Sequence, residues 1–332
     1  MSAWRKARFC FCAQPISAGR ERSRGFSPDL AEAPQVLAVG DAHLENFGTW
    51  RDAEGRLVWG INDFDDAAVM PYVFDLVRLC TSAKLSPDLK DTDKAAAAIL
   101  TGYAWGLEHP RAIILDQHAS WLRPFVTPSP DKREEFKKEI MVDPACQPPD
   151  HVKVGFKESL PDGAEIEGYA SRTKGGGSLG RPRYVTIAKW QGGIVVREAK
   201  ALVPSGWDWA HQNEGPRQFL KLARGKYRSP DPFLHLHKNF IFRRIAADSR
   251  KLDFGGEIPE RLQAIFLEAM GRDIGSIHAT SKKAAEIIQH LKTLSSSWLQ
   301  EAAKKAKGFV QKDFAAWQQA HPKLVPDRSE KE

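Results

Sequence analysis

The sequence has few cysteines and no long apolar run. Its four cysteines, Cys10, Cys12, Cys80 and Cys146, are too few and too irregularly spaced for a disulfide-stabilised scaffold. No run approaches the roughly 20 apolar residues that a transmembrane helix requires, and the first residues do not follow the pattern of an export signal. We therefore expect a cytoplasmic protein that does not insert into a membrane.

The composition that remains is that of a globular protein. The chain has 332 residues, of which 42% are hydrophobic and 27% are charged, which is enough for a sizeable core and typical of two domains or lobes. Its 49 basic and 42 acidic residues give a formal charge of +7, which favours an anionic partner without identifying it. Because no segment interleaves aromatic and basic residues, we expect no nucleic-acid partner.

Four regions differ in their sequence pattern. Residues 1–34 are basic, lack periodicity and end in a helix-like SPDLAEA segment, so we expect them to be poorly ordered. Residues 35–150 begin with apolar strands, residues 151–250 are rich in β-branched runs, and residues 251–332 show helical periodicity. The boundary between the second and third regions falls in the charged, proline-rich segment 124–149.

Individual elements can be placed within these regions. The apolar and β-branched runs predict strands at residues 35–39, 57–61, 184–190, 194–201 and 240–245, with turns around residues 52–55 and 191–193. Helices are predicted at residues 131–140 and 86–108, the second beginning at Ser86-Pro87, which fits an N-cap followed by proline. The chain is therefore expected to be α+β.

An acidic constellation lies between residues 40 and 75. GDAHLENFG and GINDFDD each follow an apolar strand, so Asp41 and Asp63 should lie at strand ends. Asn46 and Asp63 offer the oxygen ligands that Mg²⁺ prefers, and Asp41 could accept a proton from a nucleophile. An aspartate base, an asparagine five residues further on and a metal-binding aspartate on the next hairpin are typical of phosphoryl-transfer sites. His43 could take part in catalysis or only orient the loop. Asp65 and Asp66 could support the metal ligand or face solvent.

These motifs support a resemblance to known families. VGDAHLENFG, GINDFDDA and PYVFDLVRL look like the catalytic half of aminoglycoside and choline phosphotransferases. With GGGSLGRPRY, VVREA, FIFRRIAADSRK and GRDIGSIHA, the chain resembles the bacterial domain of unknown function 2252 family, which is grouped with the protein-kinase-like fold. The resemblance implies a catalytic base at Asp41, magnesium ligands at Asn46 and Asp63, and a bracing acid at Asp75.

A glycine-rich segment precedes the expected hairpin of the third region. Gly176, Gly177, Ser178 and Gly180 could lay backbone N–H groups over phosphates, and a kinase-like lobe would place a phosphate-binding cation on the following hairpin. The family resemblance places this cation and its acidic neighbour at Arg197 and Glu198, where the family usually has Lys-Glu. From the residues alone, the cation could be Arg197 or Lys200. Strand alternation puts Lys200 on the opposite face from Arg197, so we expect Lys200 to replace it only if the strand bulges.

The expected architecture is a two-lobed, protein-kinase-like fold of permuted order. Residues 35–150 and 251–332 would form the helical lobe, and residues 151–250 the β-rich lobe that covers the nucleotide. The expected function is an ATP- and Mg²⁺-dependent transfer of phosphate to a hydroxyl of an unknown small-molecule or protein acceptor. A nucleotide-binding pseudokinase, a nucleotidyl transferase or, from a different class, a basic nucleic-acid-binding protein are the alternatives.

Overall fold

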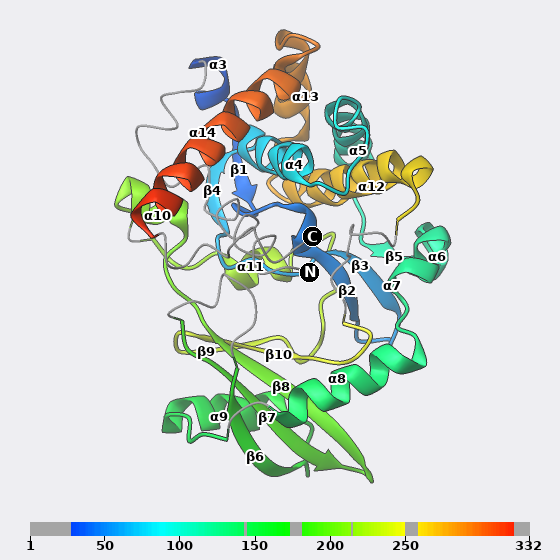
Figure 1. Cartoon of the computed structure of the whole chain (residues 1–332), viewed down its shortest axis with the longest axis vertical. Coiled ribbons are helices and arrows are strands. Elements are labelled where there is room, and N and C mark those ends of the chain that lie inside the picture. Colours follow the sequence, from blue (N-terminus) through cyan, green and yellow to red (C-terminus); the bar gives the residue numbers. More distant parts are fainter. Residues whose placement is uncertain (1–27, 143–144, 173–180, 214, 250–257, 322–332) are drawn as a thin grey trace.

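The computed structural model describes residues 28–142, 145–172, 181–213, 215–249 and 258–321 (Figure 1). The expectation of poor order for residues 1–34 falls mostly on residues 1–27, outside these ranges, and α3 (Pro28–Ala31) is the helix expected in SPDLAEA. The fold is mixed α+β, and the described residues form three sheets. Within the described ranges, no helix combines the length and apolar character that crossing a bilayer demands.

Two small antiparallel sheets and most of the long helices lie at one end of the molecule (Figure 1). The first sheet pairs β1 (Gln35–Ala38) with β4 (Ala68–Pro71). The second has the order β2-β3-β5, with bounds Phe47–Arg51, Leu57–Ile61 and Ile113–Ile114. Both sheets contribute to the largest hydrophobic core, so the loops that follow β1 and β3 are held on a rigid base.

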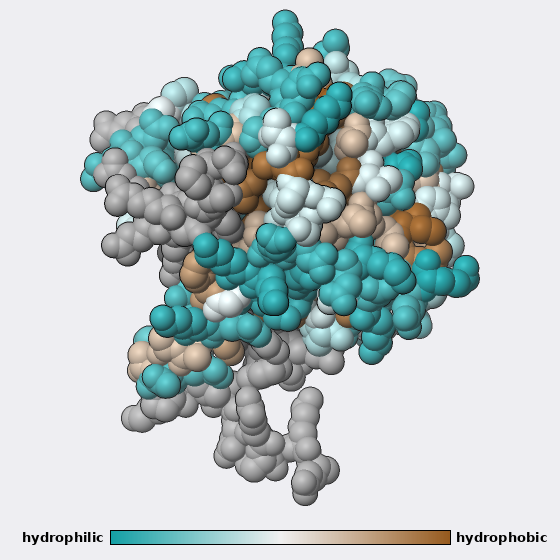
Figure 2. All heavy atoms as spheres, turned by 90° about the horizontal axis from the view of Figure 1, so that it is seen from above, coloured by the Kyte–Doolittle hydropathy of each residue, from teal (hydrophilic) through white to brown (hydrophobic). Residues whose placement is uncertain are grey.

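The helices of this end complete that core. The long ones are α4 (Val73–Leu85), α5 (Ala95–Glu108), α12 (Glu260–Ala279), α13 (Ala284–Thr293) and α14 (Trp298–Ala320). Shorter ones are η1 (Leu44–Asn46), α6 (Leu115–His118), η2 (Ser120–Leu122), α7 (Arg123–Val126), α10 (Gly206–His211) and α11 (Phe219–Ala223). Figure 2 views this end from above, where a mostly hydrophilic surface is interrupted by a few apolar areas.

One helix start differs from the sequence prediction. Ser86 ends α4 instead of capping the next helix, because its N–H donates to the carbonyls of Ser82 and Ala83, at 3.0 and 3.2 Å. The next helix, α5, begins only at Ala95. Proline after serine occurs at a helix end as well as at a helix start, and Ser86-Pro87 follows the end of α4.

The other end of the molecule is a five-stranded antiparallel sheet with the order β6-β7-β8-β10-β9 (Figure 1). Its strands are β6 (Glu165–Ser171), β7 (Arg183–Trp190), β8 (Gly193–Ala201), β9 (His235–His237) and β10 (Phe240–Arg244). Gln191 and Gly192 form the predicted turn between β7 and β8, with φ angles of 46° and 79°. Positive φ at both central positions suits the twist of a two-residue hairpin.

Two helices accompany this sheet. Helix α8 (Pro130–Val142) is the helix predicted in the proline-rich boundary, and α9 (Asp150–Ser159) packs on one face of the sheet. A small second core fills the space under α9 and consists of Val152, Phe156, Ala199, Ala201, Phe240 and Phe242. Because side chains alternate along a strand, Glu198 and Lys200 are left on the opposite face, toward the loops after β1 and β3.

Candidate functional site

The loop after β1 and the loop after β3 are in backbone contact. Gly40 has a φ of +82°, and a Cβ there would lie 2.1 Å from the carbonyl oxygen of Asp66. A side chain would be excluded both by this contact and by the backbone angle. The glycine before Asp41 therefore permits the two acidic segments expected from the sequence to lie side by side.

Asn46 joins the two loops. Its Nδ2 donates to the backbone carbonyls of Asp41 and Asp63, at 3.0 Å each. Two carbonyl acceptors fix the amide orientation, and the side-chain Oδ1 is left buried with no hydrogen-bond partner among the described residues. A buried oxygen without a donor is costly, and a cation would satisfy it.

The carboxylate of Asp41 is held by α4. Arg78 reaches Asp41 Oδ1 with Nε at 2.9 Å and Nη2 at 2.8 Å. Asp41 Oδ2 lies 3.5 Å from Nε2 of His43. Arg78 is 1% exposed and is not among the residues that the sequence singles out, although it lies one helical turn after Asp75 in the apolar first half of α4.

Asp75 is the buried acid that braces the loop after β1. Its carboxylate accepts hydrogen bonds from the N–H groups of Val39 and Gly40, at 2.7 and 2.9 Å. Its Oδ2 also lies 2.9 Å from His278 Nε2, and the other ring nitrogen of His278 lies 2.9 Å from the hydroxyl of Tyr103. The Gly40-Asp41 backbone is thus tied to α4, α5 and α12.

A second buried acid braces the loop after β3. Asp273 of α12 accepts a hydrogen bond from the Ile61 N–H at 2.7 Å and binds Arg228 at 2.7 Å. A Cβ at Gly60, where φ is +152°, would lie 2.6 Å from the carboxylate of Asp273. This close approach is available only to glycine, and it fixes the chain directly before Asp63.

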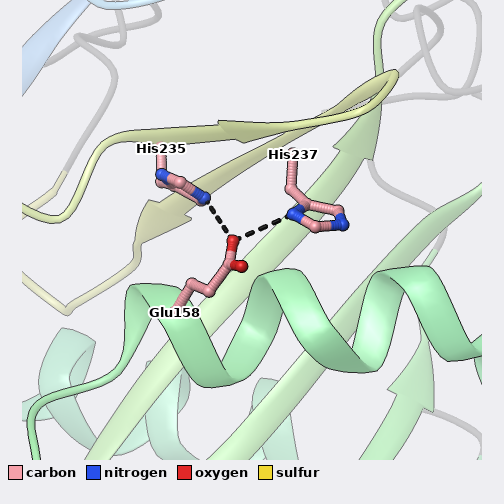
Figure 3. Close-up of side chains that lie close together, drawn as sticks. All are labelled: Glu158, His235 and His237. Atoms are coloured by element: carbon pink, nitrogen blue, oxygen red, sulfur yellow. Dashed lines mark hydrogen bonds and ion pairs between the residues drawn. The ribbon is translucent and has the colours of Figure 1, made fainter.

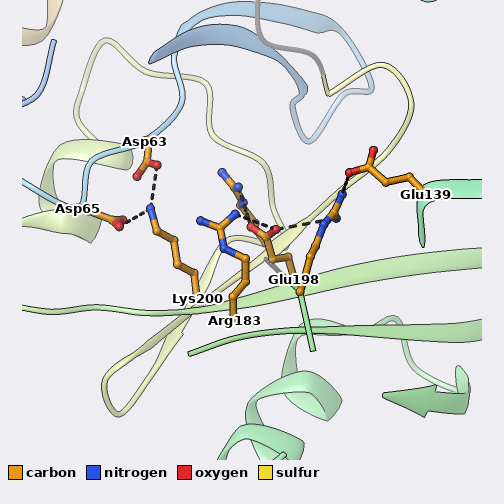
Figure 4. A network of polar contacts seen from close by, with 8 residues as sticks. Asp63, Asp65, Glu139, Arg183, Glu198 and Lys200 are labelled. Carbon is orange, nitrogen blue, oxygen red and sulfur yellow. Dashed lines mark hydrogen bonds and ion pairs between the residues drawn. The ribbon is translucent and has the colours of Figure 1, made fainter. Parts of the chain in front are cut away.

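Lys200 of β8 faces the acidic segment (Figure 4). Its Nζ lies 2.9 Å from Asp63 Oδ2 and also forms an ion pair with Asp65. Burial would lower the pKa of Lys200, but the two carboxylates raise it overall. The side chain of Asp65 is only 8% exposed, so the alternative that it faces solvent is wrong.

The pKa values of Asp65 and Asp66, which follow Asp63 closely in the chain, are raised. Burial and the negative charge of Asp63 raise the pKa of Asp65 to about 7, against the opposing effect of Lys200. Burial and the nearby Asp41 raise the pKa of Asp66 to about 6, although Asp66 accepts a hydrogen bond from the Gly206 N–H at 2.8 Å. A concentration of carboxylates that resist ionisation is typical of a site that gains from a cation.

Glu198 lies on the same face as Lys200 and is surrounded by arginines (Figure 4). Arg243 contacts one carboxylate oxygen at 2.6 Å, and Arg183 and Arg172 approach the other at 3.2 and 3.9 Å. Burial would raise the pKa of Glu198, but Arg243 and Arg183 lower it to about 2. Arg172 also binds Glu139 of α8 at 2.6 Å. None of these arginine partners was predicted from the sequence.

Arg197 lies on the other face of β8. It is 1% exposed, its Nε donates to the Ser159 carbonyl at 2.7 Å, and its guanidinium lies 4.4 Å from the Phe233 ring centre. Burial lowers its pKa to about 10, while Asp231 opposes this effect. The structure therefore brings Asp41, His43, Asn46, Asp63 and Lys200 together but does not bring Arg197 to them. The expectation that Lys200 needs a bulge is wrong, because β8 pairs with β7 and β10 in continuous register and Lys200 still reaches Asp63. The predicted phosphate loop, with Gly176, Gly177, Ser178 and Gly180, lies outside the described residues.

The comparison with protein families concerns the part of the chain that carries the acidic loops. Residues 24–105 match the family model described as "Uncharacterized protein conserved in bacteria (DUF2252)". The match supports the bacterial family expected from the motifs. The matched segment includes Asp41, Asn46, Asp63 and Asp75. Searches of curated proteins and of solved structures found no match.

Proposed function

We propose that this protein is an ATP- and magnesium-dependent phosphotransferase that acts on a hydroxyl group of a small molecule or a protein. The observation that carries the proposal is the Asn46 amide, which binds the backbone of both acidic loops and leaves Oδ1 buried with no partner in the described part of the chain. Together with the carboxylate of Asp63, this atom offers the all-oxygen donor set that suits Mg²⁺. Magnesium, when bound, would neutralise charge on the nucleotide phosphates.

In this proposal, Asp41 accepts the proton of the attacking hydroxyl. Arg78 orients its carboxylate through Oδ1, and Oδ2 is the oxygen on the side of His43. Asp75 fixes the backbone that carries Asp41. The acceptor hydroxyl would approach this carboxylate, which is partly exposed, at 20% of the side-chain area.

Lys200 is assigned to the nucleotide phosphates. It faces Asp63 from the sheet, whereas Arg197 lies on the opposite face under α9. An ammonium that is paired with two carboxylates can exchange one of them for a phosphate oxygen, because both are anionic oxygen acceptors. Glu198 and its arginines, two residues away on the same face, would hold the strand in place.

The architecture that accompanies this proposal is a permuted, kinase-like fold with two lobes. The five-stranded sheet would cover the nucleotide, and the part with α4, α5 and α12 would carry the catalytic loop and the metal ligands. Support comes from the position of Lys200, which extends from the sheet to the loop after β3. The two groups of elements would then enclose ATP between them.

A second candidate function is nucleotide binding without phosphate transfer, or transfer of a nucleotidyl group. The observation that favours it is the paired contact of Arg78 with Asp41, because a carboxylate held by an arginine is a weaker proton acceptor. The products separate the candidates: a phosphotransferase adds phosphate, a nucleotidyl transferase adds AMP, and a pseudokinase adds neither.

The test begins with thermal stability in ATP, Mg²⁺ and both together. We expect both together to raise the melting temperature of the wild type, since a ligand at 100 times its Kd stabilises a protein by about 2.7 kcal/mol. Asp63→Asn and Lys200→Met should lose most of this gain, whereas Asp150→Asn, on the exposed start of α9, should keep it. If neither ATP nor Mg²⁺ shifts the wild type, the proposal is wrong.

The second part of the test measures ATP hydrolysis, with water as the acceptor. We expect Asp41→Asn to retain the thermal shift with Mg²⁺ and ATP but to lose hydrolysis, because binding does not need the base. Undiminished hydrolysis in Asp41→Asn would contradict the assignment of the base. Retained binding with no hydrolysis in the wild type, together with no AMP transfer, would favour the pseudokinase.

A further inference from the structure

Three potential metal ligands converge on the outer face of the five-stranded sheet (Figure 3). They are Glu158 of α9 and the two histidines of β9. Glu158 Oε2 lies 2.7 Å from His235 Nε2 and 2.9 Å from His237 Nδ1. The three ligand atoms all lie within 4.8 Å of one another.

The sequence and the fold explain this convergence. His235 and His237 are two residues apart in a strand, so their rings extend from the same face. They pair with Phe242 and Phe240 of β10, whose side chains belong to the small core under α9. Glu158 lies in the last turn of α9 and meets both rings. The cluster is therefore on the face of the sheet opposite Lys200.

We propose that Glu158, His235 and His237 form a binding site for a transition-metal ion, with Zn²⁺ as the expected occupant. Two imidazole nitrogens and one carboxylate oxygen are a ligand set of zinc sites with an open fourth position, and two imidazoles disfavour Mg²⁺ or Ca²⁺. Tetrahedral Zn²⁺ with bonds of about 2.0–2.1 Å places its ligand atoms about 3.4 Å apart. The oxygen–nitrogen distances of 2.7 and 2.9 Å need to open by about 0.5 to 0.7 Å to reach this value.

The surroundings also suit an ion. The three side chains are partly exposed, at 43% for Glu158, 35% for His235 and 22% for His237, so an ion and a water ligand can enter. Among the described residues, no other hydrogen bond or ion pair uses these ligand atoms. The bound ion would join the end of α9 to β9, which is an edge strand of the sheet that the described residues form and pairs there with β10.

The experiment is a titration of untagged, EDTA-treated protein with Zn²⁺, followed by calorimetry, and with Co²⁺, followed by visible absorption. We expect one ion per chain, an increase in melting temperature of a few degrees, and Co²⁺ bands of a four-coordinate site. His235→Ala, His237→Ala and Glu158→Gln should each weaken binding by roughly 100-fold or more, beyond the 10–100-fold effect of an outer ligand partner. Circular dichroism of each variant checks that it is folded.

Two controls make the result specific. His109→Ala removes a histidine at the end of α5 that contacts Trp105, and it should bind Zn²⁺ like the wild type. Asp63→Asn should also keep Zn²⁺ binding, which separates this site from the proposed magnesium site. The proposal is overturned if the wild type binds no Zn²⁺, or if the three ligand variants bind it as tightly as the wild type. In that case the cluster is only a hydrogen-bonded link between α9 and β9.

Discussion

Removal of the Asp75 carboxylate should be among the most damaging single changes in this protein. Asp75 is completely buried and accepts hydrogen bonds from two backbone N–H groups of the loop that carries Asp41. In Asp75→Ala both donors and the ring of His278 lose their acceptor, and each unsatisfied buried donor costs about 1–3 kcal/mol. We expect a loss of about 3–5 kcal/mol in the free energy of unfolding.

Asp75→Asn should lower the free energy of unfolding less than Asp75→Ala does. The amide keeps one acceptor oxygen but turns an N–H group toward one of the two backbone donors, so we expect a loss of about 2–3 kcal/mol. Urea denaturation, followed by circular dichroism and tryptophan fluorescence, measures both variants. Asp116→Ala is the control, because its ion pair with Arg123 is exposed and such pairs contribute at most about 1 kcal/mol. A loss below about 1 kcal/mol in Asp75→Ala would refute the bracing role.

Two further predictions concern Glu198 and the crossing of α5 and α12. The pKa of Glu198 is lowered to about 2 from 4.5, so its contribution to stability is full above about pH 4.5 and declines as the pH falls toward 2. Glu198→Gln should lower the free energy of unfolding by about 3 kcal/mol at pH 7. Between pH 5 and 3 the free energy of unfolding should fall less steeply in the variant than in the wild type. Urea denaturation at each pH measures this, and equal slopes for the two proteins would contradict the prediction. In Gly102→Ala the new Cβ would lie 1.8 Å from the Glu268 carbonyl oxygen, and we expect a loss of about 2–3 kcal/mol. Gly308→Ala in α14 should instead gain up to about 1 kcal/mol, because among the described residues nothing outside the adjoining helix backbone lies within 4 Å of the new Cβ. Similar denaturation midpoints for the two variants would refute the close packing.

The sequence predicted those elements whose signals are local. The strand at residues 57–61 agrees with β3, and the turn at residues 191–193 overlaps the Gln191-Gly192 turn, since a short apolar run and a glycine turn are short-range properties. The wrong prediction of a helix start at Ser86 also comes from a local signal. A Ser-Pro pair occurs both at the start and at the end of helices, so the pair alone does not distinguish the two. Only the hydrogen bonds to Ser82 and Ala83 show that the helix ends there.

The side chains that contact the site residues could not be predicted from local sequence patterns. The sequence singled out Asp41, but its contact with Arg78 spans 37 positions. The arginines that contact Glu198 come from β7, from β10 and from the segment after β6. No pattern within β8 indicates these contacts. Ion pairs of this kind depend on which strands become neighbours, and the register of the five-stranded sheet determines that.

The two faces of β8 explain why one position along the strand matters so much for function. Arg197 and Ala199 belong to the face that packs under α9, together with Phe240, Phe242 and the histidines of β9. Glu198 and Lys200 belong to the face that meets Asp63. A strand reverses the direction of its side chains at every residue, so a cation at position 197 is held by Ser159 and Phe233 while one at position 200 reaches the acidic loops. The arginine in Arg197-Glu198-Ala199 therefore does not remove the cation from the proposed nucleotide site, because Lys200 extends to it from the correct face.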